Sequence, residues 1–242
     1  MKSTNNEKQT FSMDDFEKGL MLAGLILPNS VADINDRLQL EQYEKELNNE
    51  KRILYFKRVV LAAAIADQLY QESTFGRVKF QKLVYLCEHA AQMNLQERYS
   101  KQVAGPFDNK FMHSIETEFK NNRWFEVEKT NDGKIFRSKY KPLEKVEQYK
   151  SYFESYFGPN KTTIFYIIDL FRSIKTDRTE IAATLYSCHL ELRDISDSIS
   201  RKELINRFYE WSEAKKRFDE STVVLVWEWM LEKEIVSYPC VP

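Results

Sequence analysis

Glycine and proline are scarce in this sequence, with six of each among 242 residues. Both residue types interrupt regular structure, so their scarcity disfavours a turn-rich β fold and favours long helices. Cysteine is also rare: Cys87, Cys188 and Cys240 lie far apart and form no Cys-x-x-Cys pair. Neither a disulfide framework nor a cysteine zinc site is predicted, and a reducing, cytoplasmic location fits this usage best.

Long apolar runs and an excess of one charge are missing as well. The apolar run at residues 20–27 is interrupted by Gly24, and a bilayer span needs about 20 apolar residues. We therefore expect neither a signal peptide nor a transmembrane helix. The formal net charge is -1, so any contact with nucleic acid must come from a local basic patch and not from an overall positive field.

What is present is the composition of a folded protein with a sizeable core, since 43% of the residues are hydrophobic and 14% are aromatic. The patterns predict a mainly α fold: a helical bundle with one β-hairpin, in a winged-helix-like order. We expect N-terminal helices with a long helical arm at 1–54, a helical module with the hairpin at 55–142, and a helical lobe at 143–242. The latter two are expected to form two lobes that meet near Pro142.

The long arm is predicted because no glycine or proline interrupts residues 33–72. One apolar column recurs along it every seven residues: Leu40, Leu47, Leu54 and Leu61. The second column that a coiled coil requires is largely polar. The column is therefore expected to be buried either against this chain or against another, and a homo-oligomer through residues 33–61 is one form of the second alternative.

Shorter helices are predicted by apolar spacing and by capping residues. Their expected positions are about 12–28, 76–93, 108–119, 146–157, 164–174, 179–192, 200–211 and 220–232. Asp108 is the expected cap of the third, and Ser200 with Glu203 forms a capping box. Residues 124–142 predict a hairpin that turns at 131–133, and residues 234–239 are compatible with a short closing strand.

Catalytic and metal-binding patterns are nearly absent. His113 and Glu116 have the one-turn spacing of two metal ligands, but no second close histidine and no cysteine pair supports them. Asp108 and Asp132 are the acids a nuclease would use, yet a helix cap and a hairpin tip explain them. Phosphate-loop, nucleophile-elbow and kinase motifs are lacking. We predict no enzyme activity, no metal and no cofactor, with a metal-dependent nuclease as the third hypothesis.

The predicted hairpin is rich in basic residues, which could track the phosphates of DNA. Its candidate DNA contacts are Lys134, Arg137 and Lys139, with Lys129 and Lys141 nearby. Acidic residues dilute this patch, and lysines also commonly protect the edge of a sheet. A weak DNA contact is therefore one interpretation and a solvated edge is another. A winged-helix-type DNA-binding regulator is accordingly the alternative function.

The stretch GRVKFQKLVYLCEHAAQ at 76–92, followed by a Gly-Pro turn, resembles the Panacea-type, antitoxin-associated domain. The residues that match its Lys-x-Gln-Lys-Leu-x-Tyr helix and turn are Lys79, Gln81, Lys82, Leu83, Tyr85, Gly105 and Pro106. From about Tyr55 to the end, the chain is more similar to the C-terminal extension of some type I restriction-modification specificity (S) subunits. It has no room for their two target-recognition domains, so DNA sequence readout is not implied.

These resemblances imply a non-enzymatic protein-protein interaction module in bacterial defence, which would neutralise a toxin or dock onto restriction subunits. The expected partner-binding residues are Lys79, Gln81, Lys82, Tyr85, Gly105, Pro106 and Phe107. A turn between helices can present a ring such as that of Phe107 to a partner. For the two lysines and Gln81, plain surface charge at a helix start is the competing interpretation.

Overall fold

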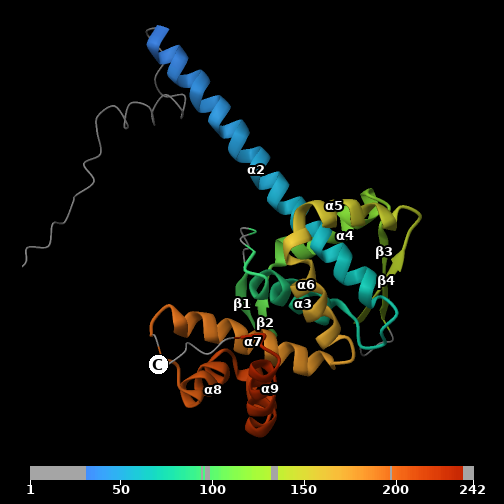
Figure 1. Cartoon of the computed structure of the whole chain (residues 1–242), viewed down its shortest axis with the longest axis vertical. Helices are drawn as coiled ribbons and strands as arrows, with labels where there is room; N and C mark the ends of the chain where they lie inside the picture. The colour runs from blue at the N-terminus through green and yellow to red at the C-terminus, as the bar shows by residue number, and fades with distance from the viewer. Residues whose placement is uncertain (1–30, 94, 96–98, 132–135, 197, 237–242) are drawn as a thin grey trace, which may run out of the picture. The chain divides into compact units, whose positions relative to one another are not determined.

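The computed structural model describes residues 31–93, 95, 99–131, 136–196 and 198–236, with the backbone alone for 31–38, 40, 130–131 and 136–137. It is mainly helical, as predicted, and its strands form two small antiparallel pairs (Figure 1). The chain divides into two compact units, residues 1–53 and residues 54–242. The helix predicted near residues 12–28 lies outside the described residues.

The long helix is α2 (Val31–Leu69), and its existence confirms the predicted arm. In the first unit, the side chains of residues 41–46 and 48–53 are exposed, and Leu47 is half-buried. In the second unit, Leu54 is partly buried against the core and Leu61 is fully buried. The C-terminal half of the leucine column, Leu54 and Leu61, is thus covered by this chain itself. The Leu40 side chain lies outside the described residues.

The second unit holds the remaining elements. Its helices are α3 (Arg77–Ala90), α4 (Asn109–Asn121), α5 (Tyr149–Phe157), α6 (Lys161–Phe171), α7 (Thr176–Arg193), α8 (Arg201–Glu210) and α9 (Glu220–Glu232), joined in places by single 3-10 turns. The predicted caps are confirmed: the Asp108 carboxylate accepts a hydrogen bond from the Phe111 amide, and Ser200 and Glu203 form the capping box of α8. No helix in the described part of the chain combines the length and hydropathy needed to cross a membrane.

The strands form two hairpins, of which only one was predicted. In the expected hairpin, β3 (Phe125–Asn131) pairs with β4 (Phe136–Pro142); Asp132 and Gly133 of its predicted turn lie outside the described residues. In the other, β1 (Ser100–Gln102) pairs with β2 (Gly105–Phe107). Gly105 and Pro106 therefore belong to a strand and not to the predicted turn, which falls at residues 103–104. Residues 234–236 form turns and bends, so the predicted closing strand is wrong over this part.

Helix α3 lies at the centre of the second unit. It packs against both α6 and α7, and it also contacts β2. Elements from before and after Pro142 are thereby joined in one core. The predicted separation of 55–142 from 143–242 is not seen, because α3 packs against α6 and α7, which both follow that boundary, and residues 54–242 form one unit.

Arg58 links three elements near this core. Its Nε lies 2.6 Å from Glu88 Oε1 on α3, and its Nη1 lies 2.6 Å from Asp108 Oδ2, the cap of α4. All three side chains are buried. The Tyr99 hydroxyl donates to the second oxygen of Glu88 over 2.9 Å. The guanidinium carbon also lies 4.1 Å from the centre of the Phe111 ring, so the cation is enclosed by acceptors and aromatic faces.

We expect Arg58→Met to destabilise the protein by about 3–5 kcal/mol, because it leaves two carboxylates buried without their cation. Chemical denaturation measures this loss. The exposed pair of Lys161 and Glu154 provides the control: Lys161→Met should cost less than about 1 kcal/mol. Equal effects of the two substitutions would show that Arg58 is not a structural cross-link.

Candidate functional site

Lys79, the first residue of the conspicuous motif, points into the protein and not into solvent. Its side chain is fully buried. Its Nζ donates to the carbonyls of Arg172 and Ile174 over 2.9 and 2.7 Å, and to Thr74 Oγ1 over 2.7 Å. The two carbonyls follow the end of α6, where helix carbonyls lack partners within the helix. Lys79 thus joins α3 to the end of α6, and burial lowers its pKa to about 8.

Lys82 and Gln81 both donate to one backbone carbonyl. Lys82 Nζ lies 2.6 Å and Gln81 Nε2 lies 3.0 Å from the oxygen of Pro106 in β2. Lys82 is 1% exposed. Burial and, to a smaller extent, nearby Lys215 lower the pKa of Lys82 to about 7, against the opposing effect of Glu180. The motif thus fixes β2 to α3 with an amine that is only weakly basic.

A third buried lysine, Lys215, lies close enough to Lys82 to affect its pKa. Lys215 is fully buried, and its Nζ lies 2.7 Å from Glu180 Oε1 on α7. Arg217 Nη2 lies 3.0 Å from the other oxygen of the same carboxylate. Burial lowers the pKa of Lys215, although its bond to Glu180 acts in the opposite direction. One buried carboxylate therefore pairs with both Lys215 and Arg217, and Arg217 also lies 3.5 Å from Asp177.

Gly105 has two reasons to be glycine. Its φ of 97° is in the region that L side chains avoid. In addition, a Cβ at this position would lie 2.5 Å from Thr184 Oγ1 and 3.5 Å from Lys82 Nζ. The strand β2 can approach α3 and α7 this closely only without a side chain at residue 105.

The remaining residues of the predicted partner site are also inside. Tyr85 is 2% exposed, and its ring contacts those of His89, Tyr99 and Tyr186. Of the seven predicted contacts, Phe107 alone is partly exposed. The interpretation of Lys79, Gln81 and Lys82 as plain surface charge at a helix start is therefore wrong, because all three side chains are buried. A partner does not reach these three side chains in this structure, because their polar atoms face carbonyls of the same chain.

No protein-family model and no curated protein matches this sequence. The resemblance to the Panacea-type domain and to S-subunit extensions therefore stays a prediction from the motif residues. The structure supplies a physical reason for their spacing. Lys79 and Lys82 lie about one turn apart on α3, and they reach the end of α6 and strand β2 respectively.

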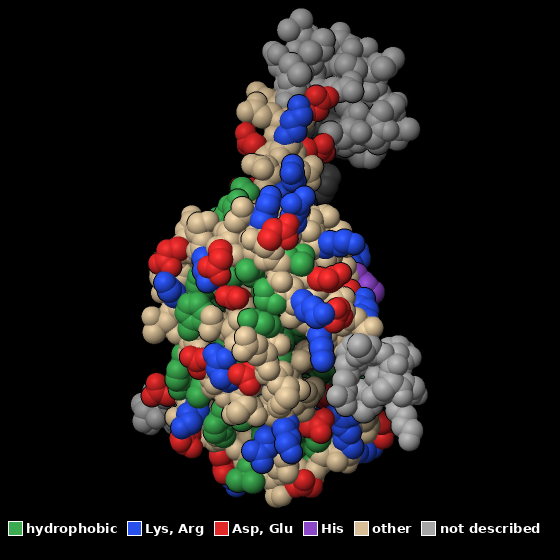
Figure 2. All heavy atoms as spheres, turned by 90° about the vertical axis from the view of Figure 1, so that its right-hand side faces the viewer, with side chains coloured by type: hydrophobic (Ala, Val, Ile, Leu, Met, Phe, Trp, Pro, Cys, Tyr) green, Lys and Arg blue, Asp and Glu red, His purple; other side chains and the backbone are tan. Residues whose placement is uncertain are grey.

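The hairpin that carries the candidate DNA contacts is partly neutralised. Lys129 lies 2.5 Å from Glu116, and Lys141 pairs with Glu128 on the opposite strand. Lys139 is exposed, whereas Lys134 and the side chain of Arg137 lie outside the described residues. On the face shown in Figure 2, basic and acidic side chains are interspersed. The described part of the hairpin does not present an unbroken positive surface.

The residues suggested for metal or nucleophilic chemistry are not brought together. The Glu116 carboxylate forms ion pairs with Arg77 and with Lys129, each over 2.5 Å, so its oxygens are already occupied. His113 is exposed. Among the described residues, no group of three or more His, Cys, Asp or Glu side chains could hold a metal ion. Cys188 is buried, and burial raises the pKa of its thiol to about 12, which disfavours the reactive thiolate.

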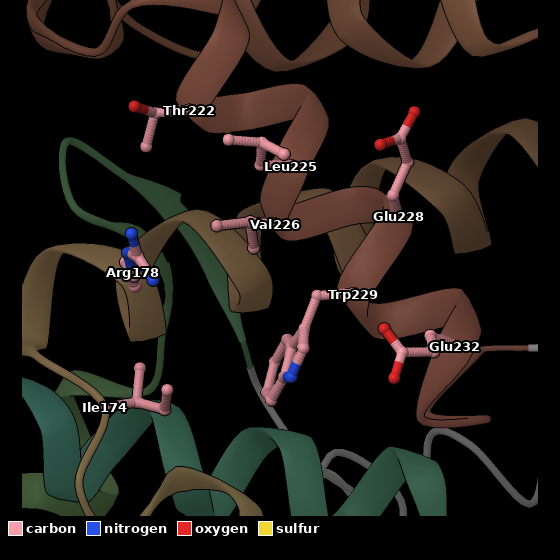
Figure 3. A pocket seen from close by; sticks show the side chains of 8 residues that line it. All are labelled: Ile174, Arg178, Thr222, Leu225, Val226, Glu228, Trp229 and Glu232. Carbon is pink, nitrogen blue, oxygen red and sulfur yellow. The ribbon is translucent and has the colours of Figure 1, made fainter.

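An open pocket that the sequence did not predict lies between α9 and the start of α7 (Figure 3). Its volume is about 370 Å³. The lining residues, called here the α9 groove, are Ile174, Arg178, Thr222, Leu225, Val226, Glu228, Trp229 and Glu232. Leu225 is 60% exposed, and Trp229 is half-buried with its ring against Phe171. Five consecutive apolar residues at 223–227 were the available signal, since a helix cannot turn all of them toward one core face.

We expect Gly105→Ala to lower stability by at least about 1 kcal/mol, because of the positive φ and the contact with Thr184. Adding Thr184→Ala should recover part of this loss by removing the atom in closest contact. Gly76→Ser is the control, since nothing lies within 4 Å of a Cβ there and serine is a good helix cap. Thermal unfolding measures all three. A neutral Gly105→Ala would contradict the close approach.

Lys82 should make stability depend on pH. Its pKa is about 7 in the folded protein, below the ordinary 10.5, so above pH 7 the unfolded chain binds more protons. Stability then rises with pH from about 7 toward 10, by at most about 1.4 kcal/mol per pH unit. Lys82→Met should lack this contribution. Denaturant unfolding of the unsubstituted protein and of Lys82→Met, between about pH 7 and 9, measures how the free energy of unfolding of each changes with pH. Lys79 and Lys215 are present in both proteins, so their contributions cancel in the comparison. Parallel curves would contradict a weakly basic Lys82.

Proposed function

We propose that this protein is a non-enzymatic protein-protein interaction module whose partner occupies the α9 groove. The exposure of Leu225 beside half-buried Trp229 carries this proposal. Fully burying a leucine contributes about 1.5–3 kcal/mol, and tryptophan is among the residues that most often dominate binding energy. An open apolar pocket beside an aromatic ring is the kind of surface that accepts an anchor side chain from another protein.

The buried ionisable residues support the same proposal, because each one described above is engaged in holding elements together. Arg58 joins α2, α3 and the cap of α4. Lys79 and Lys82 bind backbone carbonyls, and Lys215 binds Glu180. A chain whose perturbed groups are used internally, and whose open groove exposes Leu225 and part of Trp229, fits a binding module better than an enzyme.

The biological setting that we propose is bacterial defence in the cytoplasm, as a restriction-modification accessory or an antitoxin-like protein. This part rests on the motif resemblance alone. The partner would then be a restriction-modification subunit or a toxin. The exposed part of α2 in the first unit offers a further surface, where Tyr43 is 63% exposed, and self-association through residues 33–61 remains part of the proposal.

The alternative, a winged-helix DNA-binding regulator, has less physical support. Two lysines of the hairpin are paired with carboxylates. All the charged residues of α9, the helix that would enter a groove of DNA, are acidic. Phosphates repel such a helix. A weak contact through Lys139 is compatible with these observations but would be lost at physiological salt.

The test is a co-purification from the native host with a matched pair of variants. Leu225→Asp places a charge in the α9 groove, and Ile195→Asp changes a residue that is 74% exposed near the other end of α7. We expect one stoichiometric partner that is lost with Leu225→Asp and retained with Ile195→Asp. Equal retention by both variants would overturn the proposal. So would sub-micromolar duplex DNA binding that survives about 200 mM salt and is lost when Lys134, Arg137 and Lys139 become Glu.

A further inference from the structure

The charged residues that line the α9 groove are acidic on α9 and basic on α7. Helix α9 carries Glu220, Glu228 and Glu232 and no basic residue. Figure 3 shows Leu225 and Val226 pointing from α9 toward the side on which Arg178 lies, whereas Glu228 lies on the opposite side of α9 and Glu232 lies beyond Trp229 near the end of α9. The groove therefore has an apolar floor, a carboxylate side along α9, and one guanidinium on the facing wall.

The groups that now neutralise these carboxylates are exchangeable. Glu228 lies 3.0 Å from Arg201, and Glu232 lies 2.8 Å from its neighbour Lys233; all four side chains are more than a third exposed. Exposed pairs contribute little to stability, so a bound cation could replace either one at small cost. Arg178 is exposed and makes no hydrogen bond or ion pair with any residue that the structure describes.

The groove also has the dimensions of a helix-binding site. Five of its six α9 residues recur at 222, 225, 226, 229 and 232, which is one stripe of a helix, and the sixth, Glu228, lies beside that stripe. At 1.5 Å per residue the stripe is about 15 Å long, which matches about three turns of a helical ligand. Helices bound in grooves present apolar residues at i, i+3 or i+4, and i+7. One or two such residues would fill the pocket between Leu225 and Trp229.

We propose that the occupant of the α9 groove is a basic amphipathic helix of another protein. This inference rests on the proposed function and specifies the partner's chemistry. Its apolar stripe would cover Leu225, Val226 and Trp229, and Lys or Arg side chains flanking the stripe would pair with Glu228 and Glu232. An acidic residue at one end of the helix would meet Arg178 and so fix the helix direction. Nucleic acid is disfavoured here, since its phosphates would face the carboxylates.

The test uses the full chain and two synthetic peptides of about 18 residues. Both carry the same leucine stripe; the flanking positions are Lys in one peptide and Glu in the other. Fluorescence anisotropy of labelled peptide gives each dissociation constant. We expect the Lys peptide to bind at least about tenfold more tightly than the Glu peptide, with a preference that shrinks as salt rises. Glu228→Lys combined with Glu232→Lys should reverse the preference.

Matched variants separate this inference from the function on which it rests. Leu225→Asp should abolish binding of the Lys peptide, and Ile195→Asp should leave it unchanged. If both peptides bind equally and both need Leu225, the charge assignment is overturned while partner binding in the α9 groove survives. If neither peptide binds, or if binding is indifferent to Leu225→Asp, the inference falls. The co-purification then decides whether the proposed function falls with it. Analytical ultracentrifugation provides one more check. If the peptides make the protein dimerise and the Lys peptide then binds no more tightly than the Glu peptide, the inference is also overturned.

Discussion

The fold depends on a single constraint: cations that are buried must find acceptors, and in this protein the acceptors lie on other elements. Arg58 is the clearest case, since it bridges Glu88 of α3 and the Asp108 cap of α4 from α2. The same carboxylate of Asp108 also accepts from the Phe111 amide. A charge that would cost several kcal/mol if left alone in the interior thereby fixes where α4 begins and where it meets α2 and α3.

The lysines of α3 extend this arrangement to the rest of the second unit. They use backbone carbonyls in place of carboxylates, at the end of α6 and in β2. Such bonds specify position, because a carbonyl at a helix end or in a short strand has one location and direction. The α9 groove lies on the helices that this scaffold positions: Ile174, whose carbonyl binds Lys79, lines the groove itself.

Local signals predicted most helices and one hairpin, because spacing, caps and the lack of glycine and proline act within a few residues. Asp108 and Ser200 were predicted as caps for that reason. The prediction that the motif residues form an exposed partner site did not anticipate their burial, because burial depends on contacts between residues far apart in the sequence. Lys79 reaches a carbonyl 93 residues away, at Arg172, and nothing near Lys79 in the sequence indicates that partner. Gly105-Pro106 was interpreted as a turn because both residues favour turns, whereas close packing against Thr184 is the reason for the glycine.

Burial of the two motif lysines and of Lys215 has a consequence for chemical labelling of the native protein. The lowered pKa values of Lys79, Lys82 and Lys215 leave a larger fraction of each amine unprotonated, and so nucleophilic, near neutral pH than in surface lysines. All three are nevertheless enclosed, with at most 1% of Lys82 exposed. An acylating reagent would modify the outer lysines first. It would reach Lys79 or Lys82 only when α3 separates from the end of α6 or from β2, and Lys215 only when residues 213–217 separate from Glu180 of α7. The order in which lysines are acylated would therefore report how the second unit opens.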